Sequence, residues 1–179
     1  MVFQLDANGL PARYTADYAI GQPSRYGRKQ PVTTTMASAH EGAGIGGVAY
    51  DSVHDRLVAK DGNRLLLFDV RPDHMKDGPD AIAVFGQTTP NIRLSSGVGP
   101  NQVTSIDGTV LDEKNQRLFA TDGANNRILI WDIEPSHIKS QSPDAIAVIG
   151  QADFTSKVAG WMVHCLALAC WTKSASRIR

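Results

Sequence analysis

Apolar residues along this chain fall into short runs of four to seven residues, and each run is bounded by Asp, Asn, Gly or Pro. One stretch contains GVAYD, RLVAKD, RLLLFDV and AIAVFGQ in that order. Runs of this length, rich in Val, Ile, Leu and Phe and with nothing of helical length between them, predict antiparallel β-strands. The pattern therefore predicts a unit of four strands.

This four-stranded unit occurs twice, since the segment 45–87 is repeated at 106–151. Three gap-free blocks align, namely 45–62 with 106–123, 63–76 with 126–139 and 79–87 with 143–151, and 23 of the 41 aligned residues are identical. The last block reads PDAIAVFGQ in the first copy and PDAIAVIGQ in the second. A fixed period of this kind dictates the architecture and outweighs any local pattern.

A third, partial copy is predicted at the start of the chain, where Val2–Phe3 aligns with Leu67–Phe68 and residues 20–22 align with 85–87. Four short strands recurring at this spacing are typical of a β-propeller blade, which is apolar on both faces because neighbouring blades cover it. A right-handed β-helix is the main rival, but its rungs are far shorter. We predict an all-β fold, an incomplete β-propeller of about two and a half four-stranded antiparallel blades.

The predicted organisation of the chain follows the repeat. In chain order it comprises the C-terminal half of a first blade (1–22), a connector loop (23–44), a second blade (45–87), a second connector (88–105), a third blade (106–154) and a non-repeat tail (155–179). The tail matches neither unit, which favours a frameshifted or truncated reading frame over a genuine capping segment. Because blades bury their faces only when neighbours cover them, we expect this chain alone to be marginally stable and to expose apolar faces at both ends.

Two stretches, GVAYDSVHDRLVAKDGNRLLLFD and GTVLDEKNQRLFATDGANNRILIWD, resemble NHL repeats, and the trailing IGQ resembles the fourth strand of bacterial members of that group. The resemblance covers residues 2–154. It implies a β-propeller, commonly of six blades, and implies no particular activity. The first repeat departs from the family pattern at Lys60, where a small residue is usual. It also lacks the residue pair Ala124–Asn125, so its hairpin is expected to be the tighter of the two.

Composition and charge narrow the possible partners. The 179 residues are 42% apolar and 20% charged, and 18 Lys plus Arg balance 18 Asp plus Glu. This balance gives no general positive field, which argues against nucleic acid and an anionic membrane. No window is long enough to span a bilayer, and the N-terminus does not resemble a secretory signal. Cys165 and Cys170 are too few for a disulfide framework, so cysteine usage does not indicate whether the protein works in an oxidising or a reducing compartment.

The polar residues that recur in both units are candidates for either structure or chemistry. The segments Asp61–Arg64 and Asp122–Arg127 predict tight turns, with a metal or phosphate site as the alternative. Arg56 and Arg117 are expected to pair with Asp51 and Asp112 five residues earlier, with a ligand-binding role as the alternative. Two recurring histidines, His74 and His137, are predicted to pack between blades, with a catalytic or metal-binding role as the alternative. The other three histidines are expected to be surface or packed residues; they are His40, His54 and His164.

The two long connectors, 23–44 and 88–105, are predicted to run over one rim and to form a binding face. The connectors carry a modest excess of basic residues, which would suit a nucleic acid or another anionic ligand. Tyr26 is their only candidate for base stacking, however, so nucleic-acid binding is not favoured. The basic and polar residues concerned are Arg25, Arg28, Lys29, His40, Arg93 and Asn101.

We expect a non-catalytic NHL-type β-propeller segment that belongs to a larger propeller and acts as a binding or interaction scaffold for a protein or small ligand. Association through open blade faces is a further expectation. The alternative is a fragment of a metal-dependent propeller lyase or lactonase-like enzyme, for which Asn101 and Asp107 are the nearest candidate ligands. Two unrepeated residues make a poor metal cage, so no catalytic, cofactor-binding or metal-binding residue is assigned.

Overall fold

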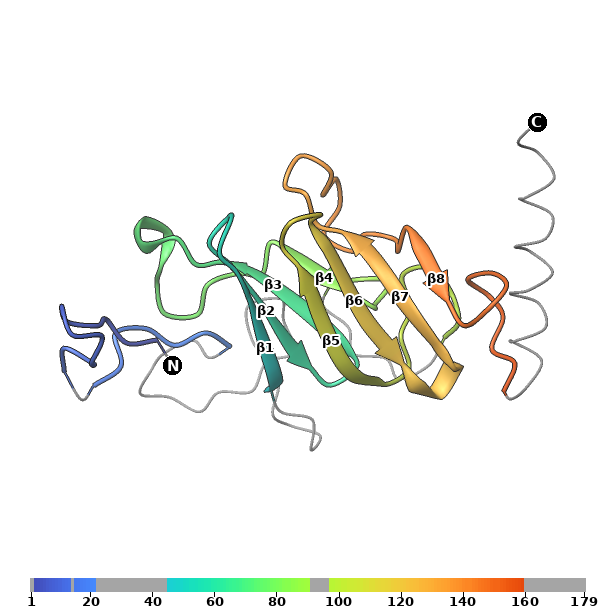
Figure 1. Ribbon diagram of the computed structural model, residues 1–179, viewed down its shortest axis with the longest axis horizontal. Coiled ribbons are helices and arrows are strands. Elements are labelled where there is room, and N and C mark those ends of the chain that lie inside the picture. The colour runs from blue at the N-terminus through green and yellow to red at the C-terminus, as the bar shows by residue number, and fades with distance from the viewer. Residues whose placement is uncertain (1, 14, 22–44, 91–96, 160–179) are drawn as a thin grey trace.

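The computed structural model describes residues 2–13, 15–21, 45–90 and 97–159, which fold as an all-β protein (Figure 1). These residues form two four-stranded antiparallel sheets, in which strands adjacent in sequence are adjacent in space. The first sheet consists of β1 (Ile45–Asp51), β2 (Arg56–Asp61), β3 (Arg64–Asp69) and β4 (Ala83–Phe85). The second sheet consists of β5 (Ile106–Asp112), β6 (Arg117–Asp122), β7 (Arg127–Asp132) and β8 (Ala147–Ile149). Short 3-10 turns, η1 (Pro72–His74) and η2 (Gly123–Asn125), follow β3 and β6 respectively.

The prediction of four antiparallel strands in each repeat is confirmed, and the two sheets share their register. Leu65 pairs with Phe85 in the first sheet, and Ile128 pairs with Ile149 at the equivalent position of the second. An irregularity near the start of the first strand also recurs, between Ile45 and Val48 in β1 and at the matching place in β5. The sequence repeat is therefore a repeat of backbone geometry.

The same backbone geometry extends into the N-terminal segment. The amide of Ile82 donates to the carbonyl oxygen of Leu67 at 2.7 Å, and the equivalent bond in the second sheet, Ile146 to Ile130, is also 2.7 Å. At the positions that the partial repeat makes equivalent, the amide of Asp17 donates to the carbonyl oxygen of Val2 at 2.8 Å. Val2 also forms an antiparallel bridge with Tyr18, as Leu67 does with Ala83. Residues 2–21 thus pair in the manner of a third and a fourth strand.

The core follows from the alternation of side chains along each strand. In β3, Leu65 and Leu67 face the second sheet and join a large apolar cluster with residues of β6 and β7, including Trp131. Leu66 and Phe68 point the other way, into a smaller cluster that Ile20 of the N-terminal segment also contacts. β3 and β4 of the first sheet are therefore apolar and buried on both faces, as the uninterrupted apolar runs predict.

Strand direction assigns the loops to two opposite edges. The turn between β1 and β2 (52–55) and the loop between β3 and β4 (70–82) share one edge. The turn between β2 and β3, the start of β1 and the end of β4 share the other edge, because Ile45 pairs with Asp61 and Phe85 pairs with Leu65. Within the described ranges, no helix has the length and apolar character that a membrane span requires.

Candidate functional site

A buried polar network ties the two sheets together at the edge formed by the β1–β2 turn. Arg56 donates to Asp51 through Nε at 2.9 Å and through Nη2 at 2.6 Å. The same guanidinium reaches the second sheet, where Nη1 donates to the carbonyl oxygen of Ile133 at 2.7 Å and Nη2 donates to the side chain of Gln116. Burial raises the pKa of Asp51, but hydrogen bonds from Arg56 outweigh it and leave this pKa below its usual value. Arg56 therefore serves as a structural link between sheets and not as a free ligand-binding cation.

The predicted pairing of arginine with the preceding aspartate is confirmed for Arg56 but is wrong for Arg117. Arg117 forms its ion pair with Asp132 at 2.9 Å, across the next strand, and donates to the carbonyl oxygen of Gln116. Asp112 instead accepts a bond of 2.7 Å from the side chain of Asn115. The physical reason is the neighbour: Arg56 has a second sheet to bind, whereas Arg117 lies 34% exposed at the far face of that sheet.

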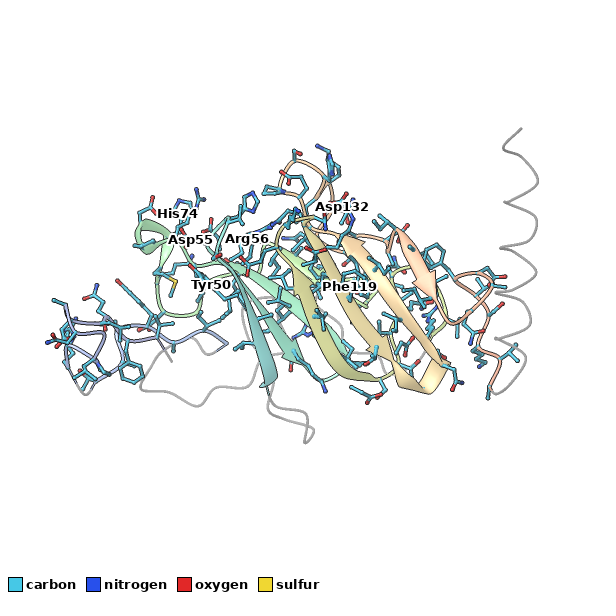
Figure 2. The ribbon with its side chains drawn as sticks, in the orientation of Figure 1. Tyr50, Asp55, Arg56, His74, Phe119 and Asp132 are labelled. Atoms are coloured by element: carbon cyan, nitrogen blue, oxygen red, sulfur yellow. The ribbon has the colours of Figure 1, made fainter. Side chains whose placement is uncertain are left out.

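A cleft of about 600 Å³ opens beside this network, between the two sheets, and we call it the rim cleft. One wall is apolar and is formed by Ile82 of the first repeat with Pro135 and Ile138 of the second. The rest of the lining is mostly polar, and Figure 2 shows Asp55 and Arg56 at this edge of the molecule. The lining residues are Val53, His54, Asp55, Arg56, Asp69, Arg71, Ile82, Pro135 and Ile138.

The charged groups of the rim cleft are held by one another. The guanidinium of Arg71 donates three hydrogen bonds to the carboxylate of Asp69, the shortest 2.6 Å, and these lower the pKa of that carboxyl below its usual range. The hydroxyl of Tyr50 donates to Asp55, which raises the pKa of the phenol. His54 contacts Asp51 at 3.2 Å. A lining that combines apolar side chains with fixed charges suits a small amphipathic group or a peptide side chain.

Sequence reasoning placed the binding face on the connectors and missed this cleft, which lies at the opposite edge of the sheets. Residues 22–44 and 91–96 of those connectors lie outside the described residues, and so do Arg25, Tyr26, Arg28, Lys29, His40 and Arg93. One signal was available in the sequence: Val53 and Ile138 are large apolar residues within segments that the strand pattern leaves as loops. Such residues mark either buried loops or binding surfaces.

The repeated Asp–Arg segments at the other edge are structural, as the turn hypothesis predicts. Gly62 and Asn63 form a two-residue turn with Gly62 at a φ of 64°, and η2 makes the second hairpin longer, so the first is the tighter. Arg64 binds Asp61 at 2.8 Å, and Arg127 binds Asp122 at 2.9 Å, with all four side chains buried.

Each of these arginines also fastens the chain that follows the fourth strand. Nη1 of Arg64 donates to the carbonyl oxygen of Pro90 at 2.9 Å, and Nη1 of Arg127 donates to that of Phe154. Pro90 and Phe154 are equivalent positions of the two repeats, since each lies three residues after the Gly-Gln pair. The guanidinium groups are therefore committed to holding the connectors in both units.

The Gly-Gln pair that ends each fourth strand also has a structural role that the sequence did not indicate. Nε2 of Gln87 donates to the carbonyl oxygen of Asn63 at 3.0 Å, and Nε2 of Gln151 donates to that of Asn126 at 3.0 Å. The glycine before each glutamine has a positive φ, 86° at Gly86 and 93° at Gly150. The repeated glutamine thus fastens the fourth strand to the β2–β3 or β6–β7 turn of its own sheet.

The predicted packing role of the two recurring histidines is wrong. Nδ1 of His74 lies 2.7 Å from a carboxylate oxygen of Asp69, and Nδ1 of His137 lies 3.0 Å from Asp132. Both imidazoles are exposed, at 44% and 61%, and each bonds the aspartate at the end of the third strand of its own unit. They stabilise the start of the following loop and do not join the units. His164, Cys165 and Cys170 lie outside the described residues.

The alternative of a metal-dependent enzyme requires several side chains that ligate one ion, and the described residues do not bring such a set together. Asp107 accepts a bond of 3.2 Å from the hydroxyl of Ser105, and its side chain is exposed. In the described ranges, no group of three or more His, Cys, Asp or Glu side chains is arranged to hold a metal ion. Asn101 is half-buried in the second connector.

Comparison with known proteins adds no family assignment. A scan against protein-family models found no match, and a search of curated proteins found none. What is established is the class: an all-β protein with two repeated four-stranded antiparallel sheets.

Proposed function

We propose that this chain is a segment of an NHL-type β-propeller and acts as a non-catalytic binding scaffold. Two sheets of identical strand order, and a third pair of strand-like segments at equivalent positions, support blades that follow one another along the chain. The stacking of the first sheet on the second supports the same arrangement. A closed ring needs further blades, so the segment is proposed to work as part of a larger propeller.

The observation that carries the scaffold proposal is the rim cleft. Its volume of about 600 Å³ is typical of sites for small molecules, and its lining combines an apolar wall with fixed charges. Two of its polar residues, Arg56 and Asp69, recur in the second unit as Arg117 and Asp132 and are held in ion pairs. Because the cleft joins loops of two units, its lining combines residues from different positions of the repeat.

The ligand class that fits the cleft is a small amphipathic molecule or a peptide side chain. Its apolar part would lie on Ile82 and Ile138, and its polar part would face Asp55 and Arg71. The described lining residues offer hydrogen-bonding and hydrophobic contacts, which suffice for recognition without chemistry.

Methyl-labelled NMR with a library of small amphipathic fragments tests this proposal. Fragments that bind should shift the methyl signals of Ile82 and Ile138, and Ile82→Asp should weaken binding about tenfold, since it places an unpaired charge in the apolar wall. Ile146→Asp is the matched control because Ile146 is the equivalent residue of the second repeat and is 52% exposed. Fragments that bind elsewhere, or none that bind, would count against the scaffold site.

Elemental analysis of the purified protein separates the scaffold from the enzyme alternative. After dialysis against calcium, magnesium and zinc salts and then against buffer, the scaffold proposal expects no stoichiometric metal ion. A retained ion at one per chain would favour the metal-dependent enzyme instead.

A further inference from the structure

The two sheets differ in how their equivalent faces are covered. The face of the first sheet that carries Leu65, Leu67, Ala83 and Phe85 is fully buried by the second sheet, and each of these side chains is 0% exposed. The equivalent face of the second sheet is not covered to this extent: Ile149, the counterpart of Phe85, is 52% exposed. We call it the open face, and it consists of Val110, Phe119, Ile128, Ile130, Ala147 and Ile149.

The open face is apolar and hollowed. A depression of about 460 Å³ lies on it, lined by Val110, Phe119 and Ile128 together with Gly108, Thr109 and Thr121. Figure 2 shows Phe119 on the second sheet, well away from the edge where His74 lies. Val110 is 64% exposed on the same face. Large apolar side chains gathered on one face mark a surface for another protein unit.

The first sheet has a second incompletely covered surface, on its opposite face. The N-terminal segment contributes only the equivalents of a third and a fourth strand, and Ile20 covers the side of this face near β3 and β4. The side near β1 is left open, where Val48 is 64% exposed and Tyr50 is 49% exposed. In the second sheet, Leu111 occupies the position of Tyr50 and packs against the core between the sheets.

The polar groups on these two surfaces are complementary in charge. In the interface seen within the chain, Arg56 donates to Gln116 and to the carbonyl oxygen of Ile133. The equivalent of Arg56 on the open face is Arg117, and the equivalent of Gln116 on the first sheet is Asp55. The internal interface thus joins arginine to an amide, whereas the two open surfaces present an arginine and a carboxylate.

We propose that the open face binds a second copy of this chain, head to tail. The open face of one copy packs on the Val48 and Tyr50 surface of the other, in the geometry of the internal interface. Arg117 leaves Asp132 and donates to Asp55 and to the carbonyl oxygen of Val70 in the second copy, the equivalents of Gln116 and Ile133. The inference rests on the proposed function in treating the sheets as stacking units, and it shares one residue, Asp55, with the rim cleft.

The N-terminal segment of the second copy competes with this association. It occupies the places that β7 and β8 of the incoming copy take, and it is held there by two bonds to the backbone of Ala19. The side chain of Asp77 accepts a hydrogen bond of 2.9 Å from the amide of Ala19. The amide of Gly78 donates a hydrogen bond of 2.9 Å to the carbonyl oxygen of Ala19. Loosening this segment is therefore expected to strengthen association.

Sedimentation velocity of the full chain over a wide concentration range tests the proposal. The wild type should show concentration-dependent association, and Arg117→Glu or Asp55→Lys should each weaken it about tenfold or more. Position 55 tolerates a long side chain, because Gln116 has the same left-handed backbone, with a φ of 52° against 49° for Asp55. An equal mixture of the two variants should restore association with the variants alternating, since both kinds of contact between unlike copies then join opposite charges.

Variants on exposed residues make the test independent of folding. Ile149→Lys and Val110→Lys should abolish association without changing the circular dichroism spectrum, and Leu10→Lys, at an equally exposed residue outside both surfaces, should leave it unchanged. Ile20→Ala should strengthen it several-fold. A wild type that stays monomeric, or association that survives the charge reversals, would overturn the proposal. Fragment binding at the rim cleft, measured in the wild type and in Arg117→Glu, whose substituted residue lies outside the cleft lining, shows separately whether the proposed function holds.

Discussion

Phe85 of the first sheet and Trp131 of the second lie against each other, with ring centroids 5.7 Å apart and ring planes inclined by 59°. Both side chains are fully buried. Phe85 is also the single position at which PDAIAVFGQ differs from PDAIAVIGQ, where its counterpart is Ile149. The one change between the two nine-residue segments therefore falls at the contact between sheets, where a tilted aromatic pair adds to the apolar area buried.

The first prediction concerns this aromatic contact. Phe85→Ala should lower the free energy of unfolding by about 3 to 5 kcal/mol, because it removes a buried ring and leaves a cavity beside Trp131. Ile149→Ala is the matched control, since it changes the equivalent but half-exposed residue and should cost less than about 1 kcal/mol. Urea denaturation followed by tryptophan fluorescence measures both. Equal losses would contradict the inter-sheet role of Phe85.

The second prediction concerns the glycine that ends the fourth strand. Gly86 has a φ of 86°, and a methyl group there would lie 3.0 Å from Val103 and 3.3 Å from the carbonyl oxygen of Asn63. Gly86→Ala should therefore destabilise the protein by about 2 to 3 kcal/mol, from backbone strain and crowding together.

A matched control separates those two causes. Gly9 has a similar φ of 76°, but a methyl group there would have nothing within 4 Å. Gly9→Ala should cost only the backbone strain, about 1 kcal/mol. Thermal melts of both variants give the comparison. A loss at position 9 that equals the loss at position 86 would show that crowding contributes nothing.

How much of this could be predicted from the sequence depends on whether the cause is local or lies in a neighbouring unit. The strands, the turn at Gly62 and the partial first copy follow from short apolar runs and a repeat, and both are visible along the chain. The pairing of Arg117 with Asp132, where Arg56 pairs with Asp51, could not be predicted from the sequence, because the two arginines have similar local sequences. What differs is the presence of a second sheet beside Arg56, which supplies Gln116 and Ile133 as acceptors.

The candidate site was missed for a related reason. The rim cleft is formed by loops of two different repeats, so Ile82 and Ile138 meet only after the sheets have stacked. The role of Gln87 was equally hidden, because its bond to Asn63 closes a distance of 24 residues. A glutamine at the end of an apolar run carries no local signal for such a contact.

The third prediction contrasts a buried ion pair with an exposed one. Arg64→Met should lower the free energy of unfolding by about 3 to 5 kcal/mol, because it removes the arginine partner of the buried Asp61 and the bond to Pro90. Arg71→Gln is the control: its pair with Asp69 is at the surface, with Arg71 50% exposed, and should contribute at most about 1 kcal/mol. Chemical denaturation at pH 7 measures both. Similar losses would contradict a structural role for the Asp61–Arg64 pair.

The last prediction concerns the pH dependence of stability. Hydrogen bonds from Arg71 lower the pKa of Asp69 in the folded protein, whereas the same carboxyl in the unfolded chain titrates near about 4. A lowered folded-state pKa means that protons bind more tightly to the unfolded chain, so this contribution to stability is present above about pH 4 and is lost as the pH falls. Asp69→Asn should therefore reduce stability at pH 7 and reduce it progressively less toward pH 3. In an Arg71→Gln background, the effect of Asp69→Asn should shrink at every pH, because the main cause of the lowered pKa has been removed. Urea titrations at stepped pH measure these differences, and an effect that grows on acidification would contradict the assignment.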